Sequence, residues 1–170
     1  MLISQKMNKA INEQIGREFG ASLQYVAIAA HFDIQNLSQL ARYFFRQAEE
    51  EREHAMRFLR YIIDAGGKSV IPDVDGPKNE FATAEEAVKL SLKWEEEVTR
   101  QICALMDLAQ KENDYTTQNF LQWFISEQLE EVSSMERLLS IVRRAGEGNL
   151  LLVEDVIARE GHPEEKSGES

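Results

Sequence analysis

The chain has 170 residues, of which 43% are hydrophobic, 29% are charged and only three are proline. This length and composition suffice for one hydrophobic core, which excludes a disordered or collagen-like chain and predicts a single globular domain. Its 30 acidic residues outnumber its 19 basic residues, giving a net charge of -11. Because this charge repels phosphate backbones and anionic lipids, we expect neither nucleic acid nor a membrane as a partner.

Cysteine use and hydropathy indicate the compartment. The single cysteine, Cys103, cannot form an internal disulfide, and the first residues lack the apolar run of a secretory signal. No segment approaches the ~18 consecutive apolar residues that a membrane-spanning helix requires. We therefore expect a cytoplasmic protein.

Helical periodicity runs through most of the chain and is interrupted at few glycines and prolines. The pattern predicts four long helices, over residues 5–34, 38–65, 83–112 and 115–145, and a short fifth helix over residues 150–159. Helices of about 30 residues would each be about 45 Å long. Such lengths are typical of a helical bundle, so the expected fold class is all-α.

The long connection over residues 66–82 holds two of the three prolines and ends at Thr83, which with Glu86 is expected to form a capping box. A connection of this length can run along the whole bundle before the next pair of helices begins. We expect one domain over residues 1–160 and a disordered polar tail over residues 161–170.

A carboxylate interrupts the apolar seam of each long helix. Read in steps of three and four, the seams contain Glu18, Glu51, Glu95 and Glu131, each near the middle of its helix. Packing would bring all four to one level, where buried like charges are very unfavourable. No lysine or arginine occupies a seam at that level, whereas His54 lies one turn from Glu51. Two divalent cations would balance the charge.

The competing interpretation is that these glutamates are ordinary surface residues, which holds for most single glutamates and acidic runs. Four independent helices would each have to place a carboxylate in the seam by chance, so we favour a metal centre. Oxygen ligands with one imidazole and no thiolate indicate iron or manganese, with iron as the first candidate.

Four segments carry a resemblance to a known family: NEQIGREFGASLQY, QAEEEREHAMRF, KWEEEVT and FLQWFISEQLEEV. With these motifs the chain resembles the non-haem bacterial ferritins over nearly its whole length. The resemblance implies a ferritin-like four-helix bundle with one long crossover connection and a short fifth C-terminal helix. It also implies oxidation of Fe(II) with O2 or peroxide at an intrasubunit, non-haem di-iron centre, and storage of the ferric mineral in a cage of 24 subunits.

The family's ligands can be carried over residue by residue. The resemblance implies that one iron is held by Glu18, Glu51 and His54, and the other by a bridging Glu51 with Glu95 and Glu131, with Gln128 nearby.

Further residues are candidates with less support. Glu50, Glu127 and Glu130 match a third iron site of the family, although such acidic runs are commonly solvated. Tyr25 is included as a catalytic candidate because it lies two turns from Glu18 on the same helix face. Tyrosines at such positions are more often core residues, and the same holds for Trp123.

Three alternatives remain open. A di-iron oxidase or oxygenase with an organic substrate would need an apolar channel to the site, and a bundle without metal would take up no iron. A bacterioferritin-like protein would show a second histidine in the segment 128–131, where this chain has Glu131, and a haem-ligating methionine where Arg52 stands. We therefore expect no haem bound by methionine.

The fifth segment, residues 150–159, is too short and apolar to form an isolated helix in water. Because the four seams are filled by their own residues, we expect it to pack against the same helix of neighbouring subunits in a cage.

Overall fold

The computed structural model describes residues 2–160 and consists of helices joined by loops, which confirms the all-α fold class. The predicted boundaries agree with the observed ones to within one residue. None of the helices in the described range is long and apolar enough to span a membrane. The elements are α1 (Gln5–Ile34), α2 (Ser38–Asp64), α3 (Ala84–Lys111), α4 (Tyr115–Ala145), the 3-10 turn η1 (Glu147–Asn149) and α5 (Leu150–Glu160).

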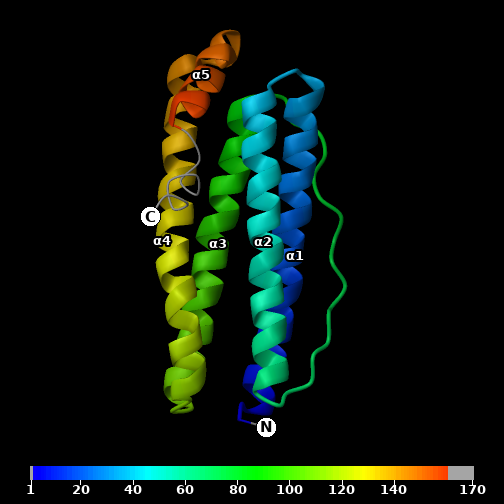
Figure 1. Ribbon diagram of the computed structural model, residues 1–170, viewed down its shortest axis with the longest axis vertical. Coiled ribbons are helices and arrows are strands. Elements are labelled where there is room, and N and C mark those ends of the chain that lie inside the picture. The colour runs from blue at the N-terminus through cyan, green and yellow to red at the C-terminus, as the bar shows by residue number, and fades with distance from the viewer. Residues whose placement is uncertain (1, 161–170) are drawn as a thin grey trace, which may run out of the picture.

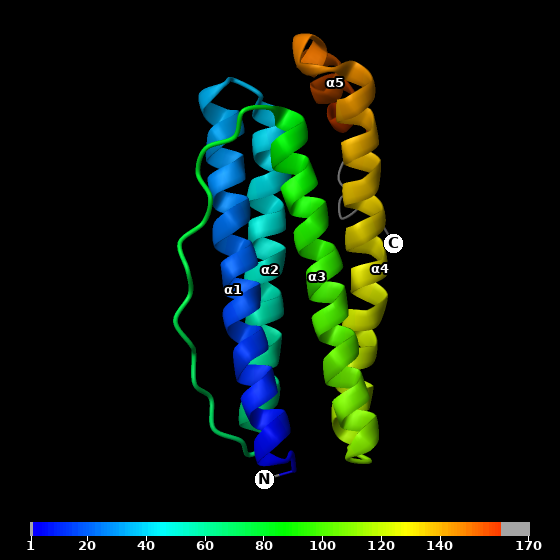
Figure 2. The ribbon, with the colours of Figure 1, turned by 180° about the vertical axis from the view of Figure 1, so that it is seen from behind.

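The four long helices form two antiparallel pairs, α1 with α2 and α3 with α4 (Figures 1 and 2). The crossover segment, residues 65–83, runs along the outside of α1 from one end of the bundle to the other. As a result α3 runs in the same direction as α2. This topology confirms the four-helix bundle with one long crossover connection.

Side chains of α1 hold the crossover segment by its backbone. Asn12 accepts a hydrogen bond from the backbone N–H of Val70 (2.8 Å) and donates one to the carbonyl of Lys68 (2.9 Å). Further along α1, Gln24 makes the same pair of hydrogen bonds with the backbone of Lys78, at 2.9 and 2.8 Å. These side-chain amides supply hydrogen-bond partners for backbone groups that, in a segment without secondary structure, have no regular backbone partners.

The predicted cap of α3 is confirmed in part. The Thr83 hydroxyl accepts a hydrogen bond from the N–H of Glu86 at 3.0 Å. The return bond of a capping box is not formed in the expected place, because the Glu86 carboxylate accepts from the N–H of Ala82 at 2.7 Å instead. The prediction was therefore wrong by one residue for this bond.

The interior consists of two apolar clusters separated by a polar layer. One cluster contains Ala21, Phe44 and Met135 and lies toward α5, and the other contains Ile15 and Phe124 and lies toward the opposite end. Between them the seams of all four helices carry polar side chains. The fold thus places one polar layer in an otherwise hydrophobic core.

One side of α5 docks on its own bundle, which differs from the expectation for this helix. Leu150 and Val153 are buried in the core cluster nearest α5, and the Glu154 carboxylate accepts hydrogen bonds from the backbone N–H groups of Gln39 and Leu40, both at 2.8 Å. These groups belong to the first turn of α2, which has no side-chain cap of its own. An uncapped helix N-terminus attracts a carboxylate, which explains the docking.

Candidate metal centre

The four seam carboxylates meet in the polar layer. Glu18, Glu51, Glu95 and Glu131 retain between 0% and 5% of their accessible surface. Each comes from the middle of a different long helix, so the bundle itself sets their level. Within residues 2–160, none of them forms an ion pair with a lysine or arginine, and Glu51 instead contacts the imidazole of His54. The layer is therefore strongly anionic when all four are ionised.

Glu18, Glu51 and His54 form the first cluster. One potential ligand atom of each lies within 4.8 Å of the other two. The Nδ1 atom of His54 is 3.3 Å from Oε2 of Glu51, and the two residues lie one turn apart on α2. Burial, with a smaller effect of Arg57, lowers the pKa of His54 to about 4, so the imidazole is neutral at physiological pH. A neutral imidazole can donate a lone pair to a cation.

Glu95 is oriented by two neighbours. The Tyr25 hydroxyl donates to Oε1 of Glu95, and Nε2 of Gln128 donates to Oε2 at 3.1 Å. Burial, followed by the charge of Glu95, raises the pKa of Tyr25 well above its ordinary value, so the phenol keeps its proton. The structure thus brings these three residues together in the polar layer.

A second cluster lies on the side of Glu131. Ligand atoms of His54, Glu127 and Glu131 lie within 4.8 Å of one another. These residues line a cavity of about 260 Å³ between α2 and α4, together with Glu50 and Glu130. Glu50 and Glu127 are half-buried, whereas Glu130 is exposed. The residues expected to form a third iron site therefore face one acidic hollow beside the layer.

The carboxyl groups of the layer resist ionisation. Burial, and then repulsion from Glu95, raises the pKa of Glu131 to about 9 and that of Glu51 well above its ordinary range. Burial likewise raises the pKa of Glu95 to about 7, although the hydrogen bonds from Tyr25 and Gln128 oppose this. Cations in the layer would lower these pKa values, because opposite charge favours the ionised form.

Several buried oxygens point to a cation. With the carboxylates ionised, no donor in residues 2–160 reaches Oε2 of Glu18, Oε1 of Glu51 or Oε1 of Gln128. Buried polar atoms without partners are rare in proteins, and here they gather in one layer. The donor set is carboxylate, amide and imidazole without thiolate, which fits iron or manganese.

Two residues around the site gained importance only from the structure. Gln14, a seam residue one turn before Glu18, donates to Oε1 of Glu18 at 2.8 Å, and its (i, i+4) spacing was the signal that could have identified it. The ring of Trp123 packs edge-on against His54, with centroids 5.4 Å apart, and the guanidinium carbon of Arg57 lies over the indole, 3.9 Å from its ring centroid. The structure thus places Trp123 against a candidate ligand.

A model of the ferritin-like domain family matches residues 8–145 of the chain, a range that includes every residue of the candidate metal centre. The chain belongs to the ferritin family. It is 44% identical to ferritin BfrB of Mycolicibacterium smegmatis over 158 residues, which cover 93% of this chain and 87% of that protein. It is also 36% identical to the bacterial non-heme ferritin of Staphylococcus aureus, over 86% of this chain and 88% of that protein.

Solved structures give the same result. An open-pore ferritin from the archaeon Archaeoglobus fulgidus superposes with a TM-score of 0.88 at 32% sequence identity. The match covers 91% of this chain and 97% of the archaeal chain. Membership of the ferritin family confirms the resemblance of the sequence motifs and makes iron storage the family function of this chain.

Proposed function

We propose that this ferritin oxidises Fe(II) with O2 or peroxide in the polar layer and stores the ferric product as mineral. The observation that carries the proposal is the set of four buried carboxylates, with a neutral imidazole beside them and unpartnered oxygens among them. Two Fe(II) substrates would neutralise the four carboxylates. They would also supply two electrons together, so that O2 is reduced to peroxide without release of a one-electron radical.

Each side chain has a role in this proposal. Glu18 and His54 bind one Fe(II), Glu95 and Glu131 bind the other, and Glu51 lies between the two positions and contacts both. Gln128 offers its unpartnered Oε1 to the second position, while its amide holds Glu95 in place. Tyr25 keeps Glu95 oriented from the opposite side.

The acidic hollow between α2 and α4 supports a third iron site. Glu50, Glu127 and Glu130 line it beside Glu131, so product leaving the second position would meet further carboxylates. We propose that iron passes through this hollow on its way to the mineral.

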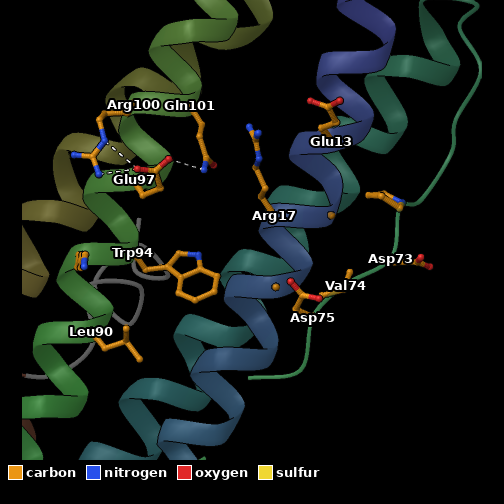
Figure 3. Close-up of a pocket in the computed structure, with 14 residues that line it drawn as sticks. Glu13, Arg17, Asp73, Val74, Asp75, Leu90, Trp94, Glu97, Arg100 and Gln101 are labelled. Atoms are coloured by element: carbon orange, nitrogen blue, oxygen red, sulfur yellow. Dashed lines mark hydrogen bonds and ion pairs between the residues drawn. The ribbon is translucent and has the colours of Figure 1, made fainter. Parts of the chain in front are cut away.

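An oxygenase with an organic substrate is less well supported. A groove of about 590 Å³ lies between α1 and α3 (Figure 3), but none of the four carboxylates of the layer is among the residues that line it. Its walls combine apolar residues such as Leu90 and Trp94 with the charged Arg17, Glu97 and Arg100, so the groove does not provide an apolar path to the layer.

The test is aerobic addition of Fe(II) to metal-free protein, followed by O2 consumption and the ferric absorbance. We expect fast oxidation of two Fe(II) per subunit by the wild type and loss of this phase in Glu51→Gln. Glu49→Gln is the matched control, because it removes an exposed carboxylate from the same helix. Equal initial rates in all three proteins would overturn the proposal.

We also propose a closed cage of 24 copies. Leu151 and Leu152 on α5 are 75% and 59% exposed, and such apolar side chains on one helix suit a contact between copies. The mass of the purified assembly in solution, measured by light scattering, tests this number directly.

A further inference from the structure

A chain of hydrogen bonds connects Glu18 in the polar layer with the surface groove between α1 and α3. The fully buried amide of Gln14 donates to Oε1 of Glu18 at 2.8 Å and to Oε1 of Gln101 at 3.3 Å. Gln101, on α3, donates in turn to Oε1 of Glu97 at 3.1 Å, and Arg100 donates to the other oxygen of Glu97 at 2.7 Å. Figure 3 shows the outer part of this chain in the wall of the groove.

Charged groups fix the direction of both amides. A carboxylate only accepts, so Glu97 orients the NH2 group of Gln101 outward and its carbonyl toward Gln14. A guanidinium only donates, and Arg17 donates to Oε1 of Gln14 at 3.3 Å, which turns the NH2 group of Gln14 toward Glu18 and Gln101. The amide of Gln14 is thereby fully hydrogen-bonded and has one orientation.

The two carboxylate oxygens of Glu18 differ in their hydrogen bonding. Oε1 is held by Gln14, whereas no donor within residues 2–160 reaches the buried Oε2 while the carboxylate is ionised. Oε2 is therefore the oxygen that remains available for a cation beside Glu51 and His54. Hydrogen bonds of this kind orient the residues that bind a metal and increase its affinity.

We propose that Gln14 and Gln101 are positioning residues that hold Glu18 ready for the first divalent cation and that Gln101 acts through Gln14. This inference rests on the proposed function, because it assumes that Glu18 binds Fe(II). Gln101 lies outside the apolar seam of α3 and is half-buried at the groove, so it can be replaced with little change in the core.

The test compares Gln14→Met and Gln101→Met with Gln110→Met, a substitution at an exposed position of α3. Methionine keeps the length of glutamine but donates no hydrogen bond. Metal-free full-length proteins are titrated with Zn²⁺ by calorimetry and with Co²⁺ by visible absorption, so that no oxidation is involved. Gln14→Met should weaken the tighter Zn²⁺ position about tenfold and change its Co²⁺ spectrum. Gln101→Met should weaken it about threefold, the effect of one neutral hydrogen bond.

The double variant should bind Zn²⁺ no more weakly than Gln14→Met, because both residues act through the same contact with Glu18. Affinities equal to that of Gln110→Met in both single variants, with the wild type binding Zn²⁺, would overturn this inference alone. A wild type that binds no Zn²⁺ in the layer would instead contradict the proposed function. If Gln14→Met does not fold, the half-buried Gln101→Met decides the question.

Discussion

At the scale of single residues, the polar layer offers a site for cations but destabilises the folded protein when no metal is bound. Glu131 has a pKa of about 9 in the folded protein against 4.5 for an ordinary glutamate, because it is buried near Glu95. The folded metal-free protein therefore binds protons that the unfolded chain releases. The stabilisation from this protonation is complete below pH 4.5 and is lost as the pH rises through about 9. His54 acts in the opposite direction, but only below its ordinary pKa of 6.5.

The first prediction follows for the range from pH 7 to pH 9. The free energy of unfolding of the metal-free protein should fall with pH, by at most ~1.4 kcal/mol per pH unit for each group that titrates. Glu131→Gln should reduce this slope because glutamine does not ionise. Urea denaturation of chelator-treated protein at several pH values measures the slope of the unfolding free energy against pH, and Glu49→Gln, at an exposed position, is the control. Identical slopes in wild type and Glu131→Gln would show that Glu131 is ionised in the folded protein.

The second prediction concerns the acidic hollow. Replacing Glu50, Glu127 and Glu130 together by glutamine removes the charges that would collect a third iron, but leaves the carboxylates of the layer in place. We expect fast oxidation of the first two Fe(II) per subunit to continue and the total of tightly bound Fe(II) to decrease by one. Anaerobic Fe(II) titration provides the count. An unchanged count would mean that the hollow is only a solvated acidic surface.

The polar layer could be predicted from the sequence because residue spacing alone gives the helix face on which a side chain lies and its height along the helix. This spacing places Glu18 and Glu131 in the interior, whichever residues they contact there. Contacts between elements that are far apart in sequence could not be predicted. Gln101 lies off the seam and reaches Gln14 only because α1 packs beside α3. Similarly, Glu154 caps α2 from a helix more than a hundred residues away, which no local pattern indicates.

At the scale of elements, the crossover segment depends on a close approach to α1. A Cβ atom added at Gly16 would overlap the Cγ atom of the Pro72 ring, and the neighbouring Cδ atom would lie 3.3 Å away. The proline ring cannot rotate away, so the segment itself would have to move. The amide bonds of Asn12 and Gln24 to the segment resist that movement.

The third prediction is that Gly16→Ala destabilises the protein although alanine favours the helix. The overlap should cost about 1–3 kcal/mol, more than the gain in helix propensity of up to about 1 kcal/mol. Gly20→Ala is the control, since its added Cβ would lie 3.7 Å from Trp94 and Val74, an ordinary contact distance. Thermal unfolding of both variants measures the difference, and a Gly16→Ala protein as stable as Gly20→Ala would contradict the argument.

At the scale of the whole molecule, α5 has two sides with different roles. The helix lies at one end of the bundle (Figure 1). Leu150, Val153 and Glu154 attach it to α2 and the core, whereas Leu151 and Leu152 are exposed. Deleting residues 149–170 would therefore disturb both the single subunit and any contact between copies. Substitutions on the exposed side separate the two effects.

The fourth prediction is that Leu151→Glu with Leu152→Glu prevents assembly of the cage but leaves the subunit folded. Each leucine buried between copies would contribute about 1.5–3 kcal/mol, and each glutamate would add a like charge where copies meet. Because every proposed ligand lies between Glu18 and Glu131, the variant should still bind two Zn²⁺ per subunit. Light scattering gives the mass and calorimetry the stoichiometry, while deletion of residues 161–170 serves as a control that retains α5. A double variant with the wild-type mass would show that the exposed side of α5 makes no essential contact between subunits.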